Sequence, residues 1–277
     1  MGVERILLPV SGRDDYEAAA QTAFVLAARY GAQVEGLHPA TPPVDRFVVQ
    51  DEAGAAMQYQ RLLEQAKAQA EKDKQTAKER FARLAQANTG IKTLFRSMEG
   101  DAGDIVGHCG RFADLTVVPK AAKKQTVFWS IVREAALFAS GRPVIIAPDK
   151  KIPAQTGDTI VIAWKESVES ARAVSAAMPL FGKAKAVHMV SVGNDRQAAR
   201  SLAEAKKYVA LHFPKVTAKL LKDRKDIAAT ILSEAALQKN PLLVMGSYSQ
   251  WRWKEWVFGG VTEFMINETK LPVLMAH

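Results

Sequence analysis

A glycine-containing stretch in the last part of the chain carries the residue types of a phosphate-binding loop. In VMGSYSQWRWKEWVFGGVTEFM, residues 244–265, an apolar run ends at Met245, Gly246 opens a polar segment, and Gly259 precedes a helical pattern. Glycine at such positions lets backbone N–H groups approach a phosphate, and the start of the next helix adds partial positive charge. The stretch therefore predicts a phosphate cradle.

The predicted binding set joins this loop to the ends of neighbouring apolar runs. The carboxyl ends of parallel strands meet at one edge of a sheet, where open α/β proteins hold their ligands. We expect the loop to contact phosphate and the strand ends to contact any base. The set is Gly246, Ser247, Ser249, Gly259, Gly260, Thr262, Ala163, Trp164, Lys165 and Val190.

Metal and catalytic chemistry have little support in the sequence. The single cysteine, Cys109, excludes an internal disulfide and suits a reducing, cytoplasmic location. The five histidines lack the spacing of metal ligands, and Asp104 with His108 reads as a helix-capping or solvated pair. We expect no metal site and no catalytic residue, so an enzyme is the disfavoured class.

Strand and helix patterns alternate along the chain, and the whole pattern occurs twice. The closing segments GRPVIIAP and KLPVLMAH align Pro143 with Pro272, an offset of 129 residues. Alternation of this kind predicts βαβ units, hence two α/β domains, each a parallel five-stranded sheet flanked by helices. We expect two separate sheets related by a pseudo-two-fold axis. The apolar runs are residues 6–10, 34–37, 91–95, 115–118 and 144–147, then 159–164, 186–192, 216–221, 242–245 and 273–275.

These repeats predict a first domain over residues 1–149, a linker over 150–157 and a second domain over 158–277. The first domain carries an insertion at about residues 41–65, which leads into a long helical pattern ending at Ala87. We expect that helix to pack on its own domain, outside both sheets. Its expected packing face is Met57, Leu62, Leu63, Ala66, Ala70, Ala77, Phe81 and Leu84.

On these motifs the chain resembles the tandem universal stress proteins of proteobacteria, which pair two flavodoxin-like domains of the HUP type. Members that bind ATP carry Gly, two residues, Gly, nine residues, Gly, then Ser or Thr. Gly246 and Gly259 match, Ser249 replaces the second glycine, and Gly260 precedes Thr262 by two residues. The resemblance implies a non-catalytic stress-response or signalling protein, with ATP, ADP or AMP in the second domain and Mg²⁺ accompanying ATP.

The first copy departs further from that motif. Pro119 stands opposite Gly246, Ala122 opposite Ser249, and Ser130-Ile131 opposite the Gly259-Gly260 pair. The aspartate that ATP-binding members place after the first strand is Ser11 here and Lys165 in the second copy. We therefore expect a degenerate first domain, and a second-domain site in which the Lys165 ammonium favours an anion over adenine.

Two other functions stay open at this point. A module that has lost nucleotide binding and only binds an unidentified protein is the main alternative, and the intramolecular domain pair leaves a homodimer open. Basic residues outnumber acidic ones 20 to 18 in residues 1–150 and 18 to 11 in 151–277, but nucleic-acid binding and nucleotide hydrolysis are disfavoured. No apolar run approaches the roughly 20 residues that span a bilayer, so we expect no membrane partner.

Overall fold

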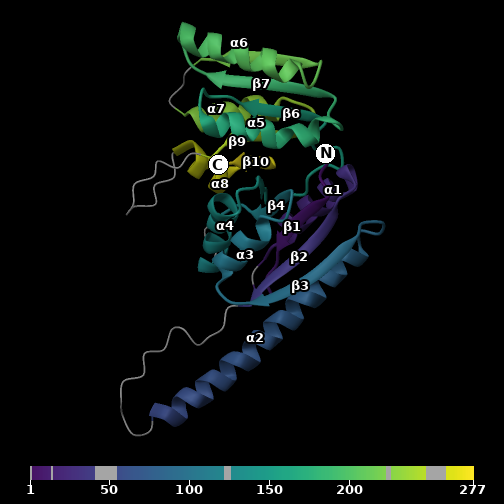
Figure 1. The fold of residues 1–277 in the computed structure, drawn as a ribbon, viewed down its shortest axis with the longest axis vertical. Helices are drawn as coiled ribbons and strands as arrows, with labels where there is room; N and C mark the ends of the chain where they lie inside the picture. Colours follow the sequence, from purple (N-terminus) through teal and green to yellow (C-terminus); the bar gives the residue numbers. More distant parts are fainter. Residues whose placement is uncertain (1, 14, 41–54, 122–125, 223–225, 248–259) are drawn as a thin grey trace.

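The computed structural model describes residues 2–13, 15–40, 55–121, 126–222, 226–247 and 260–277. Strands and helices alternate through these residues, as the repeats predict (Figure 1). The strand positions are confirmed, although β3 begins two residues later than its apolar run. The elements are β1 Arg5–Pro9, α1 Glu17–Tyr30, β2 Gln33–Ala40, α2 Ala55–Gln86, β3 Thr93–Glu99, α3 Ala102–Gly110, β4 Leu115–Pro119, α4 Val127–Ala139, β5 Val144–Ala147, β6 Thr159–Ala163, α5 Val168–Phe181, β7 Ala186–Val192, α6 Arg196–Ala210, β8 Val216–Leu221, α7 Ile227–Ala236, β9 Pro241–Gly246, α8 Gly260–Glu268 and β10 Val273–Ala276.

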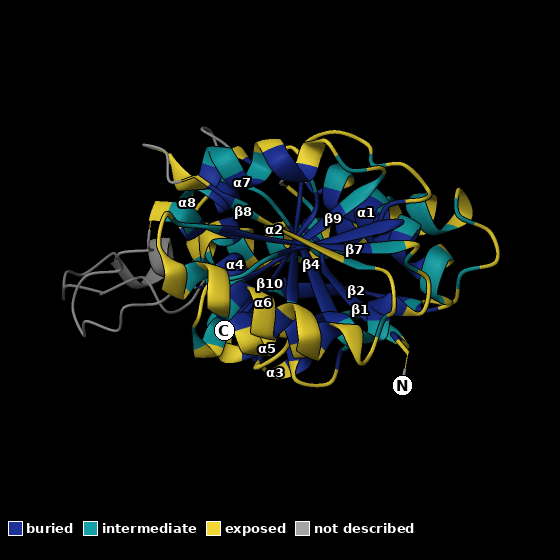
Figure 2. Cartoon of the chain, turned by 90° about the horizontal axis from the view of Figure 1, so that it is seen from above, coloured by how far each residue is buried: buried dark blue, intermediate teal, exposed yellow. Residues whose placement is uncertain are grey.

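Each half of the chain folds as expected, into five parallel strands covered by helices. The strand order is β3-β2-β1-β4-β5 in the first half and β10-β9-β6-β7-β8 in the second. Figure 2 shows the buried strands running through the middle of the molecule, with exposed helix surfaces outside them. The α/β, flavodoxin-like prediction is confirmed.

The expectation of two separate sheets is wrong, because the halves share one sheet of ten strands. Strands β5 and β10 pair antiparallel and join the two halves. Residues Val144–Ile146 and Val273–Met275 are all fully buried. Two separate edges at this depth would leave backbone N–H and C=O groups without partners in an apolar layer, and pairing the edges satisfies those groups.

The register of this joint relates the halves by a pseudo-two-fold axis. Leu274 lies opposite Ile145, which is its own counterpart at the 129-residue offset. The flanking pairs, Val273 with Ile146 and Met275 with Val144, exchange under the same relation. The strands of the two halves therefore run in opposite directions, and their carboxyl ends lie at opposite edges of the sheet.

Helix α2 packs over the first half of the sheet by its carboxyl-terminal part. Phe81 stacks on Phe24 of α1, with ring centroids 6.3 Å apart, and lies 6.1 Å from the ring of Phe95. A Cβ on Gly36 of β2 would come within 2.7 Å of the Phe81 ring. The expected face is confirmed at Ala77 and Phe81, which are buried.

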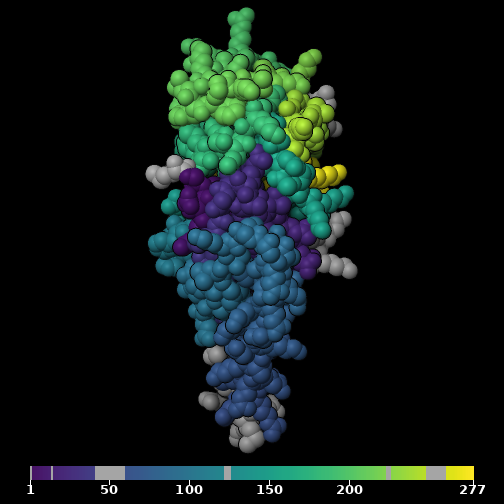
Figure 3. Space-filling view, turned by 90° about the vertical axis from the view of Figure 1, so that its right-hand side faces the viewer, coloured from purple at the N-terminus to yellow at the C-terminus, as the bar shows by residue number. Residues whose placement is uncertain are grey.

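The preceding turns of α2 leave the body of the molecule, as Figures 1 and 3 show. Leu62, which the apolar pattern placed on the packing face, is 45% exposed, so that part of the prediction is wrong. The sheet ends before this part of the helix, and its apolar side has no sheet to cover. Met57 has a side chain outside the described part, as does the inserted segment 41–54.

A buried carboxylate ties the two halves together beside the β5–β10 joint. Asp158, just before β6, accepts from Arg29 of α1 at 3.1 Å, from Lys185 at 3.0 Å and from Asn240 at 3.2 Å. The Asp158 side chain is 4% exposed. The hydrogen bond from Lys185, followed by those from Asn240 and Arg29, lowers the pKa of the Asp158 carboxyl.

We expect Asp158→Asn to lower the free energy of unfolding by about 3 kcal/mol at pH 7, because it leaves the largely buried Arg29 guanidinium without its counter-charge. A lowered pKa stabilises the fold above the ordinary carboxyl value of about 4, and this contribution is lost as the pH falls through the lower folded value. The gap between variant and parent in urea unfolding should therefore close in acid. Asp149→Asn is the control and should cost less than about 1 kcal/mol, because the Asp149 carboxylate that pairs with Lys120 is exposed. Equal losses in the two variants would contradict this role for Asp158.

Candidate functional site

Three neighbouring strands bring most of the predicted site residues to one edge of the second half. Ala163, at the end of β6, pairs with Val190 of β7 and with Met245 of β9. Gly246 ends β9 directly after Met245. The strand-end part of the predicted set therefore lies together, as the parallel order requires.

Trp164 and Lys165 continue from β6 over this edge. The Trp164 N–H donates to the Val190 carbonyl at 2.7 Å, and its indole Nε1–H donates to Ser201 Oγ of α6 at 3.0 Å. Lys165 is exposed, and its backbone N–H donates to Ser170 Oγ at 3.3 Å. The Trp164 indole is therefore held against α6, and Lys165 lies at the surface.

Gly246 has a packing role that the sequence did not indicate. A Cβ there would lie 2.6 Å from the carbonyl carbon of Glu169 and 2.8 Å from the backbone nitrogen of Ser170. These atoms belong to the first turn of α5, which Ser167 caps by accepting from the Ser170 N–H. Glycine is needed here so that α5 can pack directly against the end of β9.

The start of α5 already holds a negative charge. Glu169 lies in its first turn, and a hydrogen bond from the residue's own N–H, the largest cause, lowers the pKa of the Glu169 carboxyl. An acidic side chain at this position satisfies the partial positive charge of the helix end. The α5 start is therefore not the place for a ligand phosphate.

Ser247, directly after β9, carries a buried hydroxyl at this edge. It is fully buried, its N–H donates to the Ala276 carbonyl at 2.8 Å, and its carbonyl lies 3.3 Å from His277 Nδ1. Ser247 Oγ has no hydrogen-bond partner in the described part of the chain. Because side chains alternate across a strand and position 246 faces α5, the Ser247 side chain faces the layer of α7 and α8.

Helix α8 begins on that side with a clear approach. Gly260, its first residue, is exposed, and a Cβ there would meet nothing within 4 Å among the described residues. Thr262 is buried in the first turn. Gly259 and Ser249, also in the predicted set, lie outside the described residues, as do Trp251, Trp253 and Trp256.

The corresponding edge of the first half is covered by α2. Gly12 follows β1 so close to this helix that a Cβ would overlap the backbone of Asp73. Arg13 pairs with the Asp73 carboxylate. Arg80 follows Asp73 in the same helix. It donates to the Ser11 carbonyl at 3.2 Å and lies 4.7 Å from the centre of the buried Tyr16 ring. The place equivalent to Lys165 is therefore occupied by the chain itself.

The phosphate end of the first half is filled as well. Arg133 aligns with Thr262 at the 129-residue offset, is buried, and donates to the Pro119 carbonyl at 3.4 Å. Burial lowers the pKa of its guanidinium to about 10. Ser130 and Ile131 lie within α4, which begins at Val127, so no glycine pair opens this helix. Ala122 lies outside the described residues.

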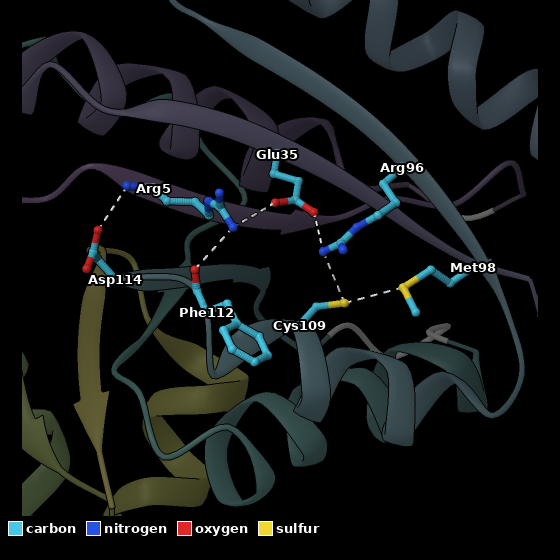
Figure 4. Close-up of polar contacts among 7 residues, drawn as sticks. All are labelled: Arg5, Glu35, Arg96, Met98, Cys109, Phe112 and Asp114. Atoms are coloured by element: carbon cyan, nitrogen blue, oxygen red, sulfur yellow. Dashed lines mark hydrogen bonds and ion pairs between the residues drawn. The ribbon is translucent and has the colours of Figure 1, made fainter.

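A polar cluster under α3 contains the single cysteine (Figure 4). Glu35 of β2 pairs with Arg96 of β3 and, at 3.7 Å, with Arg5 of β1. Arg96 also donates to Cys109 Sγ at 3.3 Å, and the Cys109 thiol donates to Met98 Sδ at 3.5 Å. Burial raises the pKa of the Cys109 thiol, which makes it a poor nucleophile and agrees with a bystander role.

Comparison with known proteins agrees with the repeated fold. The model of the universal stress protein family matches residues 2–105 and 157–277. The chain therefore belongs to the universal stress protein family, with two such segments in tandem. The comparison with curated proteins finds no match. In the described part of the chain, no helix combines the length and apolarity needed to span a membrane.

Three solved structures are similar over almost the whole chain. A universal stress protein from Archaeoglobus fulgidus DSM 4304 is 17% identical, with a TM-score of 0.68. The match covers 98% of this chain and 97% of the Archaeoglobus chain. A protein of unknown function from Pseudomonas aeruginosa PAO1 is 14% identical, with 99% and 92% covered and a TM-score of 0.58. The cytoplasmic domain of a prokaryotic cation chloride cotransporter is 11% identical, with 99% and 95% covered and a TM-score of 0.54. At these identities the likeness concerns the fold alone.

A methyl group added at Gly246 should lower the free energy of unfolding, whereas one added at Gly260 should leave it almost unchanged. We expect Gly246→Ala to lower the free energy of unfolding by about 1–3 kcal/mol, because its Cβ meets the backbone of α5. Gly260→Ala should stay within about 0.5 kcal/mol of the parent, because its Cβ meets no described residue within 4 Å. Urea unfolding measures both. A larger loss for Gly260→Ala than for Gly246→Ala would contradict the packing of this edge.

Proposed function

We propose that the chain is a stress-response protein that binds one phosphate-bearing ligand, without reacting with it, at the edge formed by β6, β9 and α8. The ligand class is a nucleotide such as ATP, ADP or AMP, or a simpler phosphate anion. The residues expected to contact it are the predicted set, with Ser247, Gly260 and Thr262 at the phosphate. The first half serves as the structural partner of the second and binds no ligand of this class.

The observation that carries the proposal is the buried Ser247 hydroxyl, which has no hydrogen-bond partner among the residues that the structure describes. Leaving such a group unpaired costs about 1–3 kcal/mol, and a phosphate oxygen would satisfy it. The neighbouring start of α8 offers backbone N–H groups, since the first turn of a helix has no internal acceptors for them. Gly260 leaves the approach to that turn clear.

The chemistry of the edge fits phosphate better than adenine. Lys165 takes the place where the resemblance implies an aspartate for the base, and an ammonium group attracts phosphate from any direction. The Trp164 indole N–H already donates to Ser201, so it is not available to a base. If ATP is the ligand, Mg²⁺ would neutralise part of the phosphate charge when bound, and the residues described above would position the phosphates around it.

Calorimetric titration with ATP, AMP and inorganic phosphate tests the proposal. We expect one ligand per chain. Ser247→Ala should weaken binding roughly tenfold, the loss of one hydrogen bond to a charged group. Gly260→Val should abolish it, because the added side chain fills the approach to α8.

Ser130→Val in the first half is the matched control for the valine variant, because Ser130 is exposed and its place corresponds to Gly259. That variant should bind like the parent. Two ligands per chain, or binding that Ser130→Val removes and Gly260→Val leaves unchanged, would overturn the assignment to the second half.

A role as a protein-binding module without nucleotide is the second candidate, and the projecting part of α2 favours it. This part extends beyond the strands of the sheet (Figure 1) and exposes Leu62 among polar side chains. An element that covers no core of its own domain is available to another protein. Absence of any heat of binding at millimolar nucleotide and phosphate would favour this candidate.

A further inference from the structure

A threonine, a histidine and a glutamate are lined up at the far edge of the second half. His188 of β7 and Thr217 of β8 lie opposite each other in the strand register. His188 Nδ1 is 2.8 Å from Thr217 Oγ1, and His188 Nε2 is 3.3 Å from Glu234 Oε1 of α7. A hydroxyl, an imidazole and a carboxylate that are hydrogen-bonded in this order form the arrangement that activates a hydroxyl nucleophile.

The carboxylate fixes the direction of the hydrogen bonds. Lys219 Nζ donates to Glu234 Oε2 at 2.7 Å, and this bond is the largest cause lowering the pKa of the Glu234 carboxyl. An ionised carboxylate only accepts hydrogen bonds, so His188 carries its proton on Nε2. In the neutral imidazole, His188 Nδ1 is then the acceptor, and the Thr217 hydroxyl donates to it. The imidazole therefore stands as a base beside the hydroxyl.

Burial separates the nucleophile from the groups behind it. His188 and Glu234 are buried, at 9% and 8% exposure, whereas Thr217 is exposed. Strand β8 is the last strand of the sheet. The Val187 N–H donates to the Lys215 carbonyl and the Gly193 N–H to the Leu221 carbonyl, so odd-numbered residues of β8 face β7. The Ala218 N–H therefore points to the open edge, next to Thr217, where it can donate to an oxyanion.

The first half provides an internal comparison. Leu94 of β3 lies opposite Glu35 of β2, in the places that Thr217 and His188 occupy in the second half. Cys109 lies eight residues after the Asp101 cap of α3, as Glu234 lies eight residues after the Asp226 cap of α7. The first-half cluster thus has no hydroxyl nucleophile and no imidazole at these places. The arrangement of hydroxyl, imidazole and carboxylate therefore belongs to the second half.

We propose that Thr217 is an activated hydroxyl that accepts an acyl group from a small activated ester. Thr217 Oγ1 attacks the carbonyl carbon and passes its proton to His188 Nδ1. The ester C–O bond then breaks, and the leaving oxygen takes the proton from His188. Thr217 is left as an acyl ester, and attack by water activated by the same imidazole would release the acid and restore the hydroxyl.

p-Nitrophenyl acetate is the probe for this proposal. With the full chain we expect release of p-nitrophenol together with an acetyl group on Thr217, located by peptide mass mapping. Thr217→Val should abolish both, and Thr217→Ser should keep both because it retains the hydroxyl. Thr93→Val is the matched control, since Thr93 is exposed on β3, the opposite edge strand, and it should behave like the parent.

The imidazole and the carboxylate are tested separately. His188→Gln should slow the reaction by about 100-fold, the usual contribution of a general base. Glu234 acts through His188 as a positioning residue, so Glu234→Gln should move the midpoint of the pH–rate profile, which a purely structural role would not do. Circular dichroism and urea unfolding check that each variant is folded. Acetylation spread over lysines without Thr217, or an unchanged rate in folded Thr217→Val, would overturn the proposal.

Discussion

The antiparallel pairing of β5 with β10 is the constraint on which the rest of the molecule depends. Residues Val144–Ile146 and Val273–Met275 are fully buried, and pairing the two strands turns two half-sheets into one. Because the pairing centres on Ile145 and Leu274, it also fixes the symmetry. The carboxyl ends of the two sets of strands lie at opposite edges, so the candidate ligand edge of the second half faces away from the corresponding edge of the first.

That separation lets the two edges differ without disturbing the shared core. In the first half, α2 crosses the end of β1, and Asp73 and Arg80 take up the space there. In the second half, Trp164 and Lys165 lie at the equivalent place, and the buried Ser247 hydroxyl has no partner within the described ranges. The two copies of the fold therefore differ at this edge. Helix α2 covers it in the first half, and in the second half a buried hydroxyl lacks a partner among the described residues.

The sequence predicted what depends on local patterns and missed what depends on long-range pairing. Apolar runs, their repetition and the glycine loop were sufficient for the strands, the tandem organisation and the strand-end residues of the site. Nothing local indicates that Ile145 meets Leu274, or that Gly12 lies under Asp73, because these contacts join distant segments. The packing reason for Gly246 and the alignment of Thr217, His188 and Glu234 depend likewise on which elements are neighbours. The face of α2 was predicted correctly where a sheet lies beneath it, at Phe81, and wrongly at Leu62, where the sheet has ended.

Hydrogen exchange of the full chain with and without ATP tests the central claim, that the second half binds the ligand and α2 closes the first, most directly. The account predicts slower exchange in peptides covering residues 242–247 and 260–266 when ATP is present, because ligand contacts hold the strand end and the start of α8. It predicts no change in peptides covering residues 7–16, which α2 already protects. Protection of residues 7–16 by ATP, with residues 242–247 and 260–266 unchanged, would contradict it.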